Sequence, residues 1–282
     1  MTNQEFLCDV VPKMNEGYRQ GATGQTKLRP LHEAMNQAIA VKLGSNYTAQ
    51  GFGVGDGVEC TVKTPNGGHW KPDLFVRRSS MPKTSTLTNG AVIDYKIPFS
   101  NVNQNIMNYI SAFRSEASLV RPHGTLFGGL IMVNEQIPYF CKDGVIDKIE
   151  TPGVKIVKEL QSHAKTNAAL DGAPDLIGLC VYRLADFDYS KIFTKDEYTE
   201  ALANYDGKIE FAPIEGIKSD GKFIFNDFIG FIDRYTELVS IRFSGTSKED
   251  SYANLFLRTP LEDQKRYLIE HNLLMDVKPY QL

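Results

Sequence analysis

The chain has 282 residues, of which 42% are hydrophobic and 23% are charged. This is the composition of an ordinary soluble globular protein that can bury a large core, and a formal net charge of −3 argues against a strongly basic nucleic-acid protein. No apolar run approaches the ~20 residues that span a bilayer, and the N-terminal segment lacks the apolar core of a secretory signal.

Charge is distributed unevenly along the chain. Residues 1–125 contain 13 of the 31 Lys and Arg and 9 of the 34 Asp and Glu, which leaves +4 in this part and −7 in the remainder. A first half that faces an anionic partner would show this asymmetry, and so would chance. The cysteines at positions 8, 60, 141 and 180 form no zinc-like or redox pair, so we expect reduced thiols in a cytoplasmic protein.

The first predicted elements are a helix, a hairpin and a strand. Residues 17–30 are a polar lead-in, and apolar residues then recur at helical spacing over 31–43. Residues 57–64 alternate like a strand, an Asn-Gly-Gly turn follows, and residues 73–78 are predicted as the returning strand. The segment VIDYKI, at 92–97, is the next predicted strand.

Helices and strands alternate further along the chain. The pattern predicts an amphipathic helix over 101–120, a central strand over 124–134, a helix over 154–166 and a buried strand over 175–184. This order indicates an α/β fold with a mixed central sheet flanked by helices.

The pattern is less regular after residue 185. We expect residues 1–185 to form the core with its lead-in and residues 186–282 to form a C-terminal α+β elaboration packed on it, used for dimerisation or DNA contacts. A separate C-terminal domain is the alternative. The elements expected there are a helix within 191–207, strands around the Ser219-Asp220-Gly221 turn, and helices over 227–240, 251–259 and 261–274.

The stretch AVIDYK combines a buried-strand pattern with two charges. Val92 and Ile93 suit a sheet interior, yet Asp94 and Lys96 follow at once. Side chains alternate along a strand, so Asp94 and Lys96 share one face with Val92, while Tyr95 lies on the other. A structural reading is a surface ion pair on an edge strand, which contributes little to stability.

A second carboxylate precedes the strand of residues 73–78. If this strand and the VIDYKI strand are neighbours, Asp73 and Asp94 can meet at one edge of the sheet. Two carboxylates that share a site repel each other unless a cation lies between them, and their hard oxygen atoms suit Mg²⁺. Lys96 can reach a phosphate oxygen from the same face, and this combination suits phosphodiester hydrolysis.

These residues carry a resemblance to a known family. Pro72-Asp73 followed by Asp94-Tyr95-Lys96 resembles the PD-(D/E)xK nuclease superfamily, which includes most type II restriction endonucleases and several DNA-repair exonucleases. The superfamily carries its first acid and its acid-x-lysine on adjacent strands of a mixed sheet flanked by helices. The resemblance covers roughly residues 31 to 184.

The resemblance implies roles for five residues. Asp73 and Asp94 would be Mg²⁺ ligands together with the backbone carbonyl of Tyr95, and Lys96 would orient the attacking water. Many members also carry a Glu on the first core helix near the metals, and Glu33 stands at the corresponding place.

The function implied is a Mg²⁺-dependent endodeoxyribonuclease of the type II restriction kind, which cuts a specific sequence in double-stranded DNA. Duplex cleavage requires one active site per strand, so we expect a symmetric homodimer. The alternatives are a repair, phage or defence nuclease without strict sequence specificity, and a non-catalytic DNA-binding protein on the same fold.

Two further groups of charged residues stand near predicted strands. Arg77, Arg78 and Lys83 could donate to backbone phosphates, and exposed loop charges are an equally simple reading. Pro174-Asp175 repeats the Pro-Asp pattern before an apolar run, but no Asp-x-Lys follows on a neighbouring strand. We therefore interpret Asp175 as part of a turn before a core strand.

Overall fold

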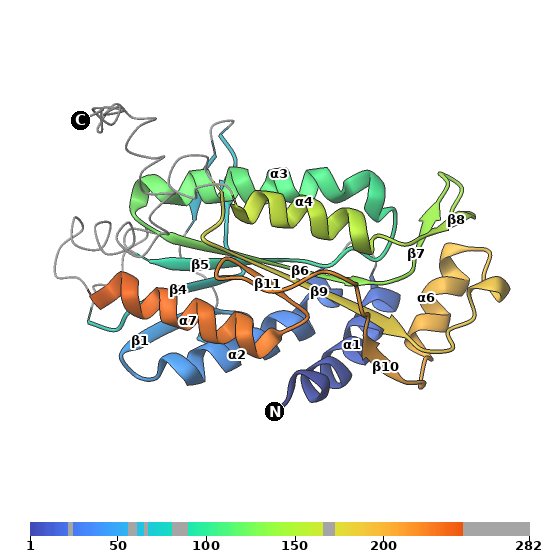
Figure 1. Cartoon of the computed structure of the whole chain (residues 1–282), viewed down its shortest axis with the longest axis horizontal. Coiled ribbons are helices and arrows are strands. Elements are labelled where there is room, and N and C mark those ends of the chain that lie inside the picture. Colours follow the sequence, from blue (N-terminus) through green and yellow to red (C-terminus); the bar gives the residue numbers. More distant parts are fainter. Residues whose placement is uncertain (22–24, 56–60, 65–66, 81–89, 166–172, 245–282) are drawn as a thin grey trace, which may run out of the picture.

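A computed structural model gives the structure of the chain (Figure 1). It describes residues 1–244, except for 22–24, 56–60, 65–66, 81–89 and 166–172. The helices are α1 (Asn3–Gln20), α2 (Arg29–Leu43), α3 (Val102–Val120), α4 (Gly153–Lys165), α6 (Lys195–Ala203) and α7 (Phe228–Ser244), with short 3₁₀ turns at Gln25–Lys27, Arg121–His123 and Tyr189–Lys191.

The strands belong to one large sheet and two small hairpins. The large sheet contains β1 (Tyr47–Gly51), β4 (Leu74–Arg78), β5 (Ala91–Lys96), β6 (Leu126–Asn134), β9 (Leu176–Leu184), β10 (Ile209–Phe211) and β11 (Phe223–Phe225). The hairpins are β2 (Val62–Lys63) with β3 (His69–Trp70), and β7 (Ile137–Phe140) with β8 (Ile146–Glu150).

The large sheet is mixed, in the order β1-β4-β5-β6-β9-β10. The pairs β1–β4, β4–β5 and β9–β10 are antiparallel, whereas β5–β6, β6–β9 and β9–β11 are parallel. The predicted α/β fold with a mixed central sheet flanked by helices is confirmed.

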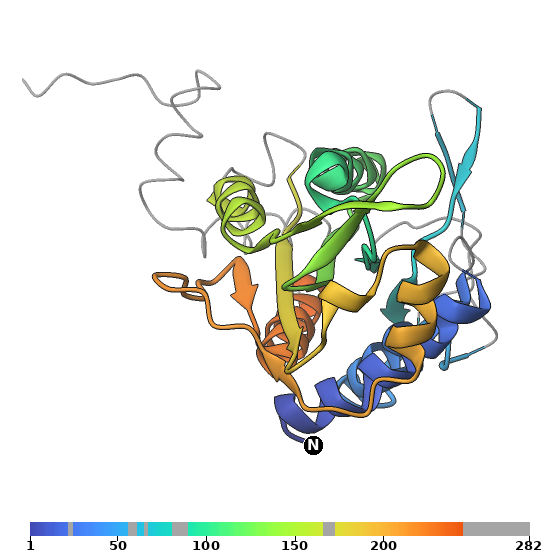
Figure 2. The ribbon, with the colours of Figure 1, turned by 90° about the vertical axis from the view of Figure 1, so that its right-hand side faces the viewer.

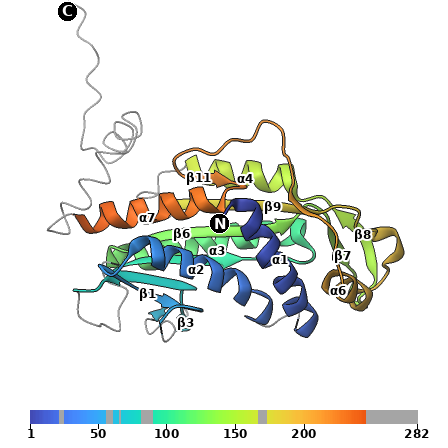
Figure 3. The same cartoon turned by 90° about the horizontal axis from the view of Figure 1, so that it is seen from below.

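The helices form layers on the two faces of this sheet. Helices α3 and α4 cover one face, and α1, α2 and α7 cover the other (Figures 1 and 2). Seen from below, α7, α2 and α1 lie in front of the sheet and cover this face (Figure 3). Each face therefore has its own apolar core, and the strands between them are buried on both sides.

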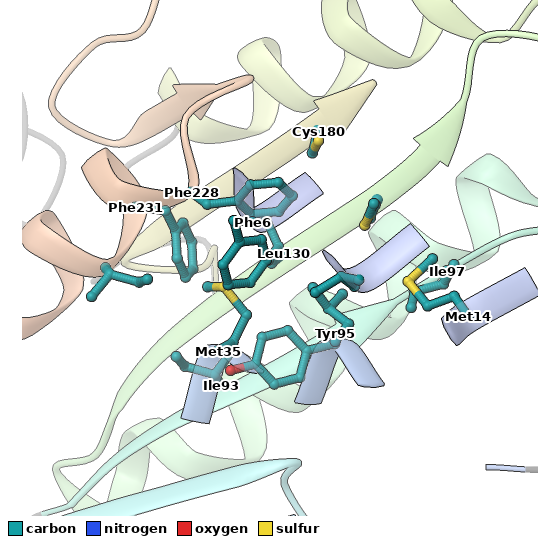
Figure 4. Packing of buried hydrophobic residues seen from close by; sticks show 14 of the residues in the cluster. Phe6, Met14, Met35, Ile93, Tyr95, Ile97, Leu130, Cys180, Phe228 and Phe231 are labelled. Atoms are coloured by element: carbon teal, nitrogen blue, oxygen red, sulfur yellow. The ribbon is translucent and has the colours of Figure 1, made fainter. Parts of the chain in front are cut away.

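Strand β5 divides its side chains between these two cores as alternation predicts. Ile93 and Tyr95 point into the core beneath α1, α2 and α7, where they pack with residues such as Met35 and Leu130 (Figure 4). Val92 lies in the core beneath α3 and α4. Asp94 and Lys96, which have the same parity, therefore lie toward α3.

The predicted hairpin partner was wrong. The strand of residues 62–63 pairs with β3, not with β4. Strand β4 instead pairs with β1 on one side and β5 on the other. The N-terminal helix α1 was not predicted, and its last residues replace the start of the expected polar lead-in.

Residues after 185 contribute to the same sheet and core. Strands β10 and β11 both pair with β9, β10 near its C-terminal end and β11 near its N-terminal end. Helix α7 packs on β6 and β9. The helices expected over 251–259 and 261–274 lie outside the described residues.

Candidate active site

Asp73 and Asp94 meet where β4 begins. The backbone N–H of Asp73 donates to the carbonyl of Ile93 at 3.0 Å, and Asp73 Oδ2 accepts from the N–H of Tyr95 at 2.8 Å. Asp73 therefore caps the open edge of β5 just beyond the last β4–β5 pair, Leu74 with Ile93. The expectation that the two strands are neighbours is confirmed.

The carbonyl of Tyr95 lies on the same side of β5. In a strand the N–H and C=O of one residue point to the same neighbouring strand, and the Tyr95 N–H points to Asp73. Tyr95 lies beyond the last β4–β5 pair, Leu74 with Ile93, so no backbone group of β4 pairs with this carbonyl. It therefore faces the space next to Asp73.

Lys96 lies between two carboxylates. Its ammonium forms an ion pair with Asp94 Oδ2, and Nζ is 3.4 Å from Glu116 Oε1 on α3. The face of the Phe113 ring is also near, with Nζ 5.9 Å from the ring centroid. All three charged side chains are largely buried, with exposed fractions of 6% for Asp94, 12% for Glu116 and 22% for Lys96.

A glycine of β6 brings α3 close to this cluster. Gly129 pairs with Asp94 in the sheet, and a Cβ at Gly129 would lie 2.6 Å from the Phe113 ring. Because Gly129 has no side chain, Phe113 packs directly on the sheet at this point. Glu116, one helical turn further along α3, then reaches Lys96.

The cluster contains more carboxylates than ammonium groups. Burial, followed by the Asp94 carboxylate, raises the pKa of Asp73 well above its ordinary value. The same two causes raise the pKa of Glu116 to about 8. Burial lowers the pKa of Lys96, but Asp94 and Glu116 outweigh it, so the net shift is upward. Without a cation, protons held by Asp73 and Glu116 compensate this surplus of carboxyl groups near neutral pH, and a bound cation would take the place of those protons.

The donor set fits a hard divalent cation. Asp73 and Asp94 lie close enough to interact directly, and carboxylate and carbonyl oxygens are what Mg²⁺ prefers in proteins. Within the described part of the chain, no three His, Cys, Asp or Glu side chains are arranged as a preformed metal centre. Mg²⁺ keeps several waters and needs only one or two protein carboxylates, so the pair remains a suitable site.

Helix α2 contributes a histidine that the sequence analysis missed. His32 is only 1% exposed, and its Nδ1 is 3.7 Å from Asp73 Oδ1. Its ring centroid lies 4.9 Å from that of Tyr95 and 5.8 Å from that of Phe52. Neither ring nitrogen has a hydrogen-bond partner among the described residues, and burial lowers the pKa of His32 to about 4. His32 is therefore neutral at neutral pH.

Asn36, one turn further along α2, fixes the other side of the cluster. Its Nδ2 donates to the carbonyls of Phe52 and Asp73, and its Oδ1 accepts from the Tyr95 hydroxyl at 2.9 Å. Asn36 thereby ties the start of β4 to the inward face of β5.

Glu33 lies beside this arrangement rather than in it. Its carboxylate forms an ion pair with Arg29 at 2.7 Å, and 36% of its side chain is exposed. A Cβ at Gly53 would meet its side chain, so Glu33 packs over that loop. His32 is the α2 side chain found next to the Asp73 carboxylate, and the role of Glu33 stays a prediction.

The second Pro-Asp segment has a different environment. Asp175 repeats the backbone arrangement of Asp73, because its N–H donates to the Phe127 carbonyl and its Oδ2 accepts from the Phe127 N–H. Its nearby charge is Arg121, with Nη1 3.7 Å from Asp175 Oδ1. Asp175 caps a strand and has a cationic partner, whereas Asp73 faces a second carboxylate.

The residues proposed to contact DNA lie on β4 and after it. Arg77 is buried, with 7% of its surface exposed, and Arg78 donates to the carbonyl of Phe243 on α7. Lys83 lies outside the described residues. The environments of Arg77 and Arg78 add no support for phosphate contacts, and these roles stay predictions.

Comparison of the chain with protein-family profiles, curated proteins and solved structures finds no match. Within the described residues, every helix is too short or too polar to cross a membrane. The case for the site therefore depends on its own residues and geometry.

Proposed function

We propose that this protein is a Mg²⁺-dependent endodeoxyribonuclease. The observation that carries the proposal is the meeting of Asp73 and Asp94, from two neighbouring strands, beside Lys96 in a mostly buried cluster that has more carboxyl groups than ammonium groups. The PD-(D/E)xK resemblance motivates the same assignment from the sequence.

Each side chain has a role in this proposal. Asp73, Asp94 and the Tyr95 carbonyl would hold Mg²⁺. When bound, this ion would act as a Lewis acid and stabilise the negative charge of a phosphodiester group. Lys96 donates from the same face and orients the nucleophilic water or a phosphate oxygen. His32 is a neutral nitrogen donor or acceptor directly behind Asp73.

A purely structural ion pair fits the cluster less well. A surface pair leaves both partners hydrated and contributes little to stability. Here Asp94 is 6% exposed, and Asp73 and Glu116 add carboxylates that the single Lys96 cannot all neutralise. Burying such a surplus destabilises the fold, so a functional ligand explains it better.

The substrate we propose is double-stranded DNA, cut at a specific sequence by a homodimer in the cytoplasm. Two strands require two active sites, and the described residues of one chain contain one such cluster. A repair, phage or defence nuclease with the same chemistry would use the same residues without sequence specificity.

Digestion of a supercoiled plasmid tests the proposal. The purified protein should nick or linearise the plasmid with Mg²⁺ and leave it intact with a chelator. Ca²⁺ should support DNA binding without turnover, because its bonds to oxygen are longer and its coordination geometry is less regular than those of Mg²⁺. Discrete fragments favour restriction-type cleavage, whereas a smear favours a nonspecific nuclease. DNA binding with no Mg²⁺-dependent cleavage on any DNA would contradict the proposal and favour a non-catalytic binding protein.

A further inference from the structure

Glu116 is a buried carboxylate that the proposed roles leave unused. It projects from α3, which carries no other acidic residue, and its side chain is 12% exposed. Its Oε1 lies 3.4 Å from Lys96 Nζ, while no donor among the described residues reaches the buried Oε2. Burying such a group destabilises the fold unless partners compensate for it, and in the described part of the chain only one of its two oxygens has a partner.

Lys96 and a divalent cation would compete for the Asp94 carboxylate. The Lys96 ammonium is in contact with Asp94 Oδ2, and a cation held by Asp73 and Asp94 would draw on the same Asp94 carboxylate. Two positive charges at one carboxylate repel each other. Lys96 therefore needs a second anionic partner when the cation is present.

We propose that Glu116 is a positioning residue that receives the Lys96 ammonium when a divalent cation binds Asp94. This inference rests on the proposed cation-dependent function. Lys96 needs no large movement, because Glu116 Oε1 is already 3.4 Å from Nζ and the Phe113 ring borders the same position. Glu116 thus keeps Lys96 at the site and leaves Asp94 free for the cation.

A double-mutant cycle on cation binding separates this role from direct ligation. Mn²⁺, which also prefers carboxylate oxygens, is titrated without DNA, and the free ion is counted by electron paramagnetic resonance. The proteins are wild type, Glu116→Gln, Lys96→Met and the double variant, with Glu237→Gln on the exposed surface of α7 as the matched control.

The proposal predicts coupling between the two positions. Glu116→Gln should weaken Mn²⁺ binding by roughly tenfold, the size of effect seen for residues that support metal ligands. In the Lys96→Met background the same change should have little effect, because no ammonium competes for Asp94. An equal loss in both backgrounds would show that Glu116 acts directly on the cation and would overturn the proposal, as would no loss in either.

Labelling of Lys96 gives a second measurement if Lys96→Met does not fold. An amine-reactive reagent is applied with and without Mn²⁺, and the labelled peptide is quantified by mass spectrometry relative to Lys191, which is 82% exposed. Mn²⁺ should leave Lys96 protected in wild type and expose it in Glu116→Gln. Equal protection in both proteins would overturn the proposal.

Plasmid cleavage by the same wild-type preparation keeps the two hypotheses apart. Cleavage without coupling leaves the nuclease function standing and removes the role of Glu116. Coupling without cleavage supports the role of Glu116 at a cation site and contradicts the nuclease function. Wild type that neither binds Mn²⁺ nor cleaves DNA contradicts both.

Discussion

Asp73 and Asp175 show how one residue pattern can occur in two different environments. Both follow proline, both open a strand, and both accept a backbone N–H of the neighbouring strand at 2.8 Å. The difference is the next charged group, which is Arg121 for Asp175 and the Asp94 carboxylate for Asp73. The chemistry of a short motif is decided by this environment and not by its letters.

The raised pKa of Glu116 predicts a pH-dependent stability. The folded protein holds the Glu116 proton up to about pH 8, whereas the unfolded chain releases it near 4.5. The stabilising contribution is thus complete below pH 4.5 and is lost as pH rises toward 8. Without divalent cation, the free energy of unfolding of wild type relative to Glu116→Gln should fall over this range. Urea unfolding of both proteins at pH 5, 6.5 and 8 measures it, and a difference that does not vary with pH would contradict the assignment.

Replacing His32 by Phe separates function from packing. Phe can keep the ring contacts with Tyr95 and Phe52 while removing two buried nitrogens that lack partners. We expect the free energy of unfolding to stay within about 1 kcal/mol of wild type or to rise, because an unsatisfied buried polar group is removed. Cleavage should fall by roughly tenfold or more, as for groups that orient metal ligands. Full activity in the Phe variant would show that the imidazole has only a packing role.

At the scale of elements, Gly51 of β1 controls how closely three elements approach at the site. A Cβ there would lie 2.5 Å from the carbonyl oxygen of Asp73 and 2.7 Å from Nδ2 of Asn36. Gly178 of β9 is equally crowded, by Leu130 and Phe231, but it lies in the sheet core. The two glycines form a matched pair, one at the candidate site and one away from it.

Alanine at these two positions should therefore differ in effect. Both Gly51→Ala and Gly178→Ala should destabilise the fold by about 1–3 kcal/mol, because each overpacks a filled region. Only Gly51→Ala should also lower the cleavage rate of the folded fraction, since it displaces the backbone that carries Asp73. Thermal unfolding and cleavage rates at a temperature where both variants are folded distinguish these effects. Equal losses of cleavage would mean that the position of Asp73 is not the sensitive quantity.

Sequence patterns predicted the buried elements well and the polar ones poorly. Strands β6 and β9 are long, mainly apolar runs, and β5 begins with three apolar residues; all three strands are almost wholly buried, and apolar patterns of this kind predict strand positions. Strand β1, with the sequence YTAQG, has no apolar alternation and forms because it pairs with β4. The predicted pairing of residues 62–63 with β4 was wrong for the same reason, because pairing between strands depends on tertiary contacts.

The candidate site was predictable in part. Alternation placed Asp94 and Lys96 on one face, and their strand lies beside Asp73 as expected. Glu116 also had a signal, because it interrupts the apolar stripe of a predicted amphipathic helix between Phe113 and Ala117. His32 had none, since a histidine at the start of such a helix fits solvent and core equally well.

At the scale of the whole molecule, side chains from both helix layers meet at the site. The layer of α1, α2 and α7 supplies His32 and Asn36, and the layer of α3 and α4 supplies Phe113 and Glu116. Strand β5 passes between these layers and carries Asp94 and Lys96 toward α3 and Tyr95 toward the other layer. The site therefore depends on the complete three-layer arrangement.

A homodimer is predicted at this scale. A restriction-type enzyme should sediment as a dimer at the protein concentration that cleaves duplex DNA, because each strand needs its own cluster. Sedimentation velocity across a range of concentrations checks this. A monomer that still cuts both strands in a single binding event would contradict the restriction-type proposal while leaving the nuclease chemistry intact.

The most direct test of the account is the Mg²⁺-dependent cleavage rate of Asp94→Asn beside that of Asp233→Asn. Both changes remove one carboxylate, but Asp233 is exposed on α7 and pairs with Lys42. Circular dichroism and thermal unfolding first show that both variants are folded. We predict that Asp94→Asn lowers the cleavage rate by roughly 100-fold or more, because it removes a group central to transition-state stabilisation. Asp233→Asn should cleave at the wild-type rate. Cleavage by folded Asp94→Asn at the wild-type rate would contradict the claim that Asp94 is part of a Mg²⁺-dependent active site.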